Sequence, residues 1–185
     1  MLKKVMSLLL LISLSFLGSI NAQEKLEPPT DAFGKTVMQC LKANGIDAQY
    51  KRATNQLFVM LKQQFANKNV PNSVWEDLET IKPTALENIK IRMIQAYKVH
   101  FNEEDVNQML SFYVSDEGEK MLTNGNNLTD EERKVIKDFF HTTTGQKMME
   151  SQASLTKMIG EISETWSSEL YQKQIEKLAE RGFSL

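Results

Sequence analysis

The chain has 185 residues, a length suited to one domain, and its 22 basic and 24 acidic side chains give a net charge of −2. Lysine and arginine form no cluster, and such a mildly acidic chain is not typical of proteins that bind nucleic acid or anionic membrane surfaces. Cys40 is the single cysteine, which excludes an internal disulfide and a zinc site built from several cysteines.

Residues 1–22 have the pattern of a secretory signal peptide. Lys3 and Lys4 supply the positive start, an apolar core follows, and Ala22 is a small residue before the expected cleavage site. The apolar run is shorter than the roughly 20 residues that a membrane-spanning helix needs. No cysteine stands at the cleavage site, which argues against a lipid anchor. We therefore predict an exported protein, periplasmic or secreted, that begins at Gln23.

The N-terminal part after this signal is expected to be helical. Residues 23–30 are polar, contain two adjacent prolines and predict a short disordered lead. A helix is predicted over 31–43, followed after Asn44-Gly45 by an amphipathic helix that continues to about residue 65. Cys40 lies on the apolar stripe of the first helix. Burial is the common environment of a free cysteine, and an intermolecular bridge is the alternative.

A short helix is predicted from Ser73, and Pro83 is expected to break it. Thr84 and Glu87 have the spacing of a capping box that would open the next helix, which runs to about His100. That helix is apolar on two faces, which predicts a central position in the fold.

An internal repeat dominates the second half of the chain. The segment 101–122 returns as 128–149, an offset of 27 positions. Each copy predicts a helix, a one-turn break and a second helix, with N-cap residues Asn102 and Thr129. The matched positions are Phe112-Tyr113 with Phe139-Phe140, Gly118 with Gly145, and Lys120-Met121 with Lys147-Met148.

Gly118 and Gly145 fall in the first turn of the second helix of each copy, where helix propensity alone would not favour glycine. We interpret them as positions where a neighbouring backbone or aromatic ring approaches closely. An anion site at the helix N-terminus is the alternative, but one glycine among acidic neighbours does not make a phosphate cradle.

The first copy resembles a known family, the bacterial domain of unknown function 2059 (DUF2059). The signature of that family is an acidic helix start, then Phe-Tyr, then Ser-Pro-x-Gly followed by a basic residue. Asp116 here stands in place of the proline. The resemblance implies an exported, all-helical domain and brings no catalytic residues. We expect the motif residues to be structural: Phe112, Tyr113, Ser115, Gly118 and Lys120.

Beyond the repeat, the pattern predicts one long helix from about Gly145 to Arg181, with an apolar stripe that includes Trp166. No segment shows the sustained period-2 alternation of a strand. We therefore predict an all-α fold, a multi-helix bundle of roughly seven to eight helices with an internal helix-turn-helix repeat and a long C-terminal helix. Residues 31–185 are expected to form a single domain.

No group of residues has the spacing expected of a catalytic or cofactor site. His100 and His141 lack a ligand partner four residues away or a nearby cysteine. The acidic runs that begin at Glu103 and Asp130 stand in first helical turns, where carboxylates complement the helix dipole. The serines lack the context of a nucleophile elbow. We predict no catalytic residue, no metal, no cofactor and no enzyme activity.

Two functions remain as hypotheses. The first is a non-enzymatic module that binds a protein or peptide in a chaperone-like or assembly role, or forms a homodimer through the C-terminal helix. The second is a carrier that holds an apolar small molecule or lipid between its helices. Eight methionines follow the signal peptide, and methionine lines adaptable apolar grooves. Exposed apolar surface on the long helix would favour the first hypothesis, and a Met- and Phe-lined cavity the second.

Overall fold

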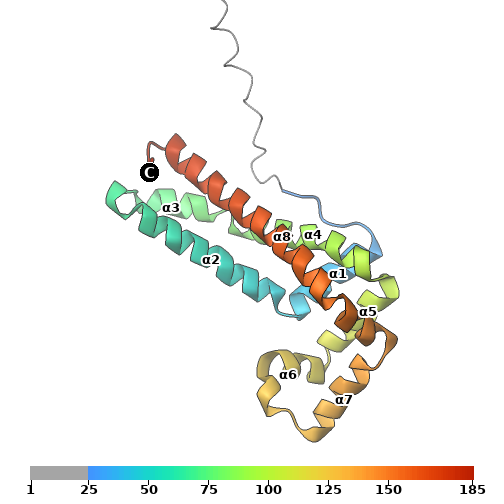
Figure 1. Cartoon of the computed structure of the whole chain (residues 1–185). Coiled ribbons are helices and arrows are strands. Elements are labelled where there is room, and N and C mark those ends of the chain that lie inside the picture. Colours follow the sequence, from blue (N-terminus) through green and yellow to red (C-terminus); the bar gives the residue numbers. More distant parts are fainter. Residues whose placement is uncertain (1–24) are drawn as a thin grey trace, which may run out of the picture.

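The structure is a computed structural model that describes residues 25–185 (Figure 1), so the predicted signal peptide and the start at Gln23 lie outside the described residues. Within 25–185 the secondary structure consists of eight α-helices and two short 3-10 turns, without a strand, which confirms the all-α prediction. The helices are α1 (Ala32–Ala43), α2 (Ile46–Gln64), α3 (Asn72–Glu79), α4 (Lys82–His100), α5 (Glu103–Tyr113), α6 (Asp116–Asn124), α7 (Asp130–Phe140) and α8 (Thr143–Glu180), with 3-10 turns at Ala66–Lys68 and Gly125–Asn127.

Helix α4 has the central position that its two apolar faces predict, because it packs against α1, α2 and α8. Helix α8 runs along α2, α3 and α4 and also contacts α5 and α7 (Figure 1). At one end α5 packs on α1, and the hairpin of α6 and α7 projects away from the other helices (Figure 1). We call residues 101–149 the repeat lobe, and α1 to α4 with the rest of α8 the body.

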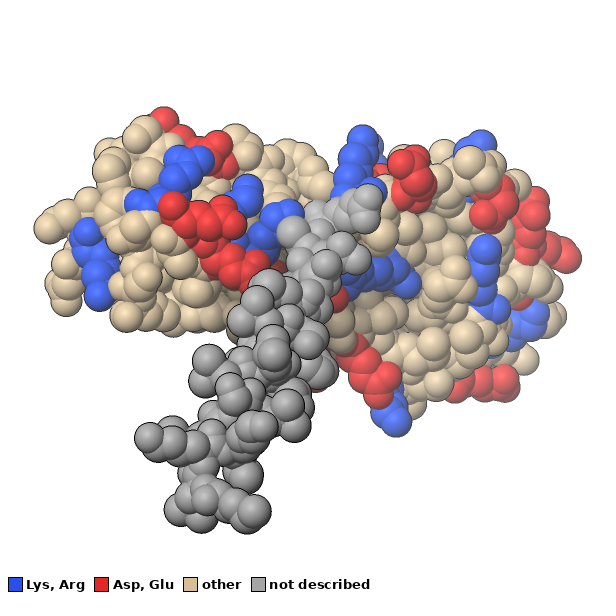
Figure 2. Space-filling view, turned by 90° about the horizontal axis from the view of Figure 1, so that it is seen from above, with Lys and Arg blue, Asp and Glu red and all other residues tan. Residues whose placement is uncertain are grey.

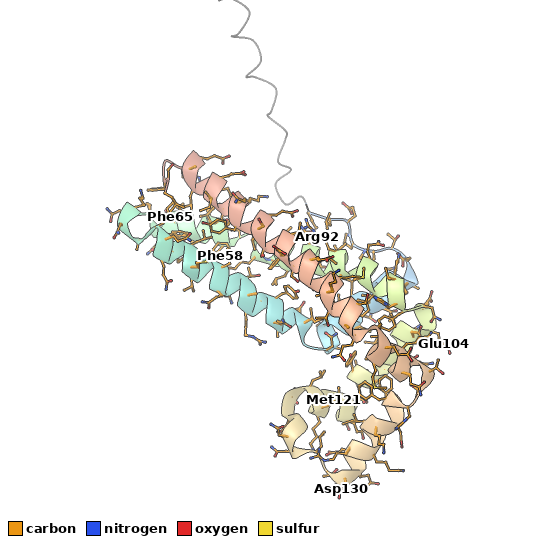
Figure 3. The ribbon with its side chains drawn as sticks, in the orientation of Figure 1. Phe58, Phe65, Arg92, Glu104, Met121 and Asp130 are labelled. Atoms are coloured by element: carbon orange, nitrogen blue, oxygen red, sulfur yellow. The ribbon has the colours of Figure 1, made fainter. Side chains whose placement is uncertain are left out.

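Apolar side chains form two clusters. The larger one joins α1, α2, α4, α5 and α8 around Ile89, Met93 and Trp166. The smaller one lies where α2, α3 and α8 meet, and contains Phe58 and Phe65, which are labelled in Figure 3. The stripe of α8 therefore faces the inside of the same chain.

Trp166 shows this most directly. Its side chain is buried, and its indole N–H donates a hydrogen bond to the carbonyl oxygen of Ala85 on α4, at 3.0 Å. Leu170, one turn further along α8, is completely buried. A partner of the C-terminal helix would have to contact residues outside this stripe.

The start of α4 differs from the prediction. The helix begins at Lys82 with Pro83 in its first turn, and Ile81 precedes it without a side-chain capping bond. The predicted break at Pro83 and the predicted capping box of Thr84 with Glu87 were therefore wrong. Proline is tolerated here because first-turn N–H groups have no partner within the helix, so the missing N–H removes no helical hydrogen bond.

Residues 25–30 have no regular secondary structure but contact α4, where the Leu26 N–H donates to Asn88 Oδ1 at 2.9 Å. Cys40 is buried, as predicted, and its thiol donates to the Val106 carbonyl oxygen at 3.3 Å. Burial raises the pKa of the Cys40 thiol to about 12.

Charged side chains of both signs are mixed on the face shown in Figure 2. Figure 2 shows lysine, arginine and acidic groups interspersed on the visible part of one face, without a large patch of one sign. Among the helices of residues 25–185, none combines the length and the apolar character required to cross a membrane.

Candidate functional site

The two breaks of the repeat have the same hydrogen-bond geometry. Ser115 Oγ accepts from the Gly118 N–H at 3.1 Å and donates to the Phe112 carbonyl oxygen at 2.7 Å. Thr142 Oγ1 accepts from the Gly145 N–H at 3.1 Å and donates to the Phe139 carbonyl oxygen at 2.7 Å. One hydroxyl in each copy thus ends one helix and caps the next.

The glycines of these joints are required for the close approach of the backbone. A Cβ at Gly118 would overlap the carbonyl oxygen of Phe112. A Cβ at Gly145 would overlap the carbonyl oxygen of Phe139 and the Cα of Phe140. The interpretation of both glycines as close-approach positions is confirmed, and both glycine N–H groups already donate to a hydroxyl of their own joint.

The two copies face each other through equivalent residues. The rings of Phe112 and Phe139 are stacked in parallel with centroids 3.9 Å apart, and Phe140 meets both rings edge-on. Contact between equivalent positions is what a two-fold arrangement of the copies produces.

The ion pairs of the lobe are also exchanged between copies. Lys120 of the first copy binds Glu132 of the second at 2.5 Å, and Lys147 of the second binds Asp105 of the first at 2.7 Å. Asp105 and Glu132 are the capping-box acids of α5 and α7. Each lysine therefore holds the N-terminus of a helix in the other copy.

These partners change the pKa of both acids. Hydrogen bonds from Lys120 and from the Thr129 backbone N–H lower the pKa of Glu132 to about 2. Burial alone would raise the pKa of Asp105, but hydrogen bonds from Lys147, the Asn102 N–H and Thr144 lower it below its usual value. Both acids are therefore carboxylates at neutral pH, with structural roles.

A cavity of about 390 Å³, the Met pocket, opens where the repeat lobe meets the body. Met109 lies buried at its inner side and Met149, 52% exposed, at its mouth. None of the residues that line it is charged, and Gln152 and Thr156 supply the polar side chains of its rim. The remaining lining residues are Ile46, Tyr97, Phe101, Tyr113, Phe140, Met148, Leu155 and Ile159.

A larger hollow of about 970 Å³, the elbow hollow, lies between the α1–α2 junction and helices α5 and α6. Tyr113 lines both this hollow and the Met pocket. The charged residues that line the elbow hollow are Lys42, Arg52 and Glu119. The others are Gln39, Ala43, Asn44, Gly45, Ala48, Gln49, Leu110, Val114, Leu122 and Thr123.

The predicted motif residues therefore divide by role. Phe112, Ser115, Gly118 and Lys120 build the joint and the contact between the two copies. Tyr113 alone among them lines the two hollows, where burial raises the pKa of its phenol to about 12.

The two histidines occupy different surroundings. His100 is in the last turn of α4 beside the ring of Phe101, whereas His141 is exposed at the end of α7. Across residues 25–185, no group of three or more histidine, cysteine or acidic side chains is arranged to hold a metal ion.

The sequence identified the methionines but not their meeting point. Met109 belongs to α5 and Met148 and Met149 to the start of α8, so only the packing of α8 against α5 brings them to one pocket. The repeat gave a partial indication, because Met148 occupies the position equivalent to Met121 of the first copy.

The fold and its joints define an all-helical protein with an internal two-fold repeat and an apolar pocket beside it. Residues 87–131 match the family described as Uncharacterized protein conserved in bacteria (DUF2059). The match runs from within α4 to the start of α7 and includes the whole motif, which confirms the resemblance over that segment. Comparisons with curated proteins and with solved structures give no match.

Proposed function

We propose that the chain is a non-enzymatic binding protein that holds an apolar ligand between its helices. The observation that carries this proposal is the Met pocket, in which Met109, Met148 and Met149 meet aromatic rings from α4, α5 and α7. Its volume of about 390 Å³ is in the usual range for small-molecule sites. The flexible thioether side chain adapts to ligands of different shape, which suits a carrier.

The packing of α8 also favours a ligand carrier over an interface on that helix. The apolar stripe that could have bound another chain is used inside the body, where Trp166 and Leu170 are buried. An apolar ligand needs a cavity and not an exposed apolar helix face, and the Met pocket provides a cavity where the repeat lobe meets the body.

A second candidate is binding of a protein or peptide in a chaperone-like or assembly role. The observation that favours it is the apolar rim of the elbow hollow, where Val114 at the end of α5 and Leu122 on α6 are exposed. Exposed apolar groups beside a groove are typical of interaction sites.

The proposal includes export and the absence of catalysis. Export is supported by the signal pattern of residues 1–22 and by the resemblance to an exported family. N-terminal sequencing of protein taken from the envelope should begin at Gln23, and retention of Met1 in that protein would contradict export with cleavage. The absence of turnover is supported by the structural use of the Asp105 and Glu132 carboxylates in helix capping.

Binding of an apolar fluorescent probe, N-phenyl-1-naphthylamine, tests the pocket directly. Met149→Glu places a charge at the mouth of the Met pocket, and a charge in apolar surroundings is unfavourable. We expect this variant to weaken probe binding by about tenfold or more, equivalent to about 1.4 kcal/mol. Met60→Glu is the matched control, because Met60 is 41% exposed on α2 and lines neither hollow.

The outcome separates the two candidates. Equal probe binding by both variants and the unchanged chain would remove the Met pocket as the site. A native mass spectrum of protein purified from its own envelope then shows what it carries. A co-purified apolar small molecule supports the carrier, whereas a stoichiometric polypeptide supports the second candidate.

A further inference from the structure

The Met pocket and the elbow hollow are neighbours that share one wall. Tyr113 lines both. Adjacent residues of the chain also line different hollows: Gly45 and Leu110 line the elbow hollow, and their neighbours Ile46 and Met109 line the Met pocket. The two differ in charge: no charged side chain lines the Met pocket, whereas Lys42, Arg52 and Glu119 line the elbow hollow beside polar and apolar residues. A ligand with an apolar end and a polar end could therefore occupy both.

The charges of the elbow hollow determine which polar end fits. Lys42 in the last turn of α1 and Arg52 on α2 line it, against the single carboxylate of Glu119 among its lining residues. Within residues 25–185 neither Lys42 nor Arg52 forms an ion pair. The hollow is thus net positive in a chain whose net charge is −2.

The wall itself offers a further donor. Among the described residues the Tyr113 hydroxyl has no hydrogen-bond partner, and this hydroxyl lies on the residue that lines both hollows. Because burial raises the pKa of Tyr113 to about 12, the phenol stays protonated at neutral pH and can donate.

On the basis of the proposed function, we infer that the ligand is a long-chain carboxylate, with its chain in the Met pocket and its carboxylate in the elbow hollow. Lys42 and Arg52 supply the positive charge that faces the carboxylate, and the guanidinium of Arg52 can bind a carboxylate through two parallel hydrogen bonds. The Tyr113 hydroxyl donates where the chain meets the head group. A single apolar pocket fits a ligand with one chain.

Calorimetric titration with dodecanoate and with dodecanol, both at monomeric concentrations, tests this inference. The two ligands have the same chain and differ in the charge of the head group. We expect dodecanoate to bind about tenfold or more tightly than dodecanol, a preference of about 1.4 kcal/mol. In Lys42→Glu/Arg52→Glu this preference should disappear, because dodecanoate binding weakens much more than dodecanol binding.

The control variant is Lys35→Glu/Lys51→Glu, which makes the same change of charge at exposed positions of the same two helices, outside both hollows. It should retain the preference for dodecanoate. A second variant, Tyr113→Phe, keeps the ring in the wall and should weaken dodecanoate binding more than dodecanol binding.

Each outcome decides one of the two proposals. Equal affinity of the unchanged chain for both ligands, or a preference that survives Lys42→Glu/Arg52→Glu, would overturn the carboxylate inference and leave the apolar carrier standing. A preference that is lost equally in the control variant would overturn it as well. Failure of both ligands to bind, together with failure of the fluorescent probe, would overturn the proposed function itself.

Discussion

The two copies of the repeat share their local structure but not their burial. The joints that contain Gly118 and Gly145 have the same hydrogen-bond distances. Yet α5 buries Val106, Met109 and Phe112, whereas no residue of α7 is fully buried. Helix α5 packs mainly on α1 of the body, whereas α7 packs on α6 and α8, so the same local sequence is core in one place and surface in the other.

This difference shows that the motif specifies the break between two helices, whereas the contacts of that break with the rest of the chain determine how much it contributes to stability. Asp105 shows the contrast in a single side chain: it is 5% exposed, whereas its equivalent Glu132 is 23% exposed. Substitutions at paired positions should therefore separate effects of the joint, equal in both copies, from effects of burial, larger in the first.

The largest expected effect is at the stacked rings. Phe112 is 6% exposed, and we expect Phe112→Ala to lower the free energy of unfolding by about 3–5 kcal/mol, as for other buried phenylalanines. Phe139→Ala should cost clearly less, because that ring is only partly buried and loses mainly its stacking contact. Urea unfolding of the two variants measures both values.

The exposed residue Val135 on α7 provides the control for this pair. Val135→Ala should change the free energy of unfolding by no more than about 0.5 kcal/mol. Equal losses for Phe112→Ala and Phe139→Ala would show that burial against the body does not distinguish the copies. No loss in either variant would remove the stacked rings as a source of stability.

The glycine joints should behave alike in both copies. In Gly118→Ala and Gly145→Ala the new methyl group overlaps a backbone carbonyl, which cannot move aside as a flexible side chain can. We expect each substitution to cost about 1–3 kcal/mol, the usual range for overpacking. Thermal or urea unfolding measures the change.

Gly160 is the matched control, because it lies within α8 with open space around its Cα. Gly160→Ala should stabilise the chain by up to about 1 kcal/mol through helix propensity alone. A similar stabilisation in Gly118→Ala would contradict the close approach of the backbone. A large difference between Gly118→Ala and Gly145→Ala would contradict the equivalence of the joints.

Local signals in the sequence predicted the helices and the joints well. The N-caps at Asn102 and Thr129, the glycines of the joints and the stop of α8 before Gly182 depend on residues within a few positions of each other. The role of Pro83 was predicted wrongly, because a proline can either end a helix or stand in the first turn of the next one, and its neighbours in the sequence do not distinguish these two roles.

Long-range packing was not predictable in the same way. Gln174 is completely buried on α8, and neither atom of its amide has a hydrogen-bond partner among the described residues. Helical periodicity gives no reason to bury a glutamine there. The Met pocket is similar, since Met109 and Met149 are brought together only by the packing of α8 against α5.

The next comparison concerns the exchanged ion pairs. In Asp105→Asn the amide NH₂ can face the Asn102 N–H in place of an accepting oxygen, and Lys147 loses its anion. We expect a loss of about 1.5–2 kcal/mol, in the lower part of the range for hydrogen bonds to charged groups. Glu132→Gln should cost less, because its ion pair with Lys120 is more exposed to solvent than that of Asp105.

Urea unfolding at neutral pH measures both substitutions. A larger loss for Glu132→Gln than for Asp105→Asn would reverse the assigned order of burial. The exposed pair of Lys134 with Asp138 on α7 gives the control, since Asp138→Asn removes a carboxylate that joins neither the other copy nor a helix N-terminus.

The smallest effect is expected in acid, where both exchanged ion pairs titrate. Their lysines hold the pKa of Glu132 at about 2, below an ordinary value of 4.5, and the pKa of Asp105 below 3.8. A carboxyl whose pKa is depressed in the folded state stabilises the fold above its unfolded pKa, and this stabilisation is lost as the pH falls through the folded pKa. The free energy of unfolding should thus change little above about pH 5 and decrease from there toward pH 2.

In Lys120→Met/Lys147→Met the folded pKa of both acids should lie closer to the unfolded value, so the decrease should be shallower. Urea unfolding at several pH values compares the slopes, with Lys134→Met as the control that keeps the steep one. An unchanged slope in the double variant would show that carboxylates elsewhere cause the acid sensitivity, and that the exchange between the copies positions the helices without coupling them to pH.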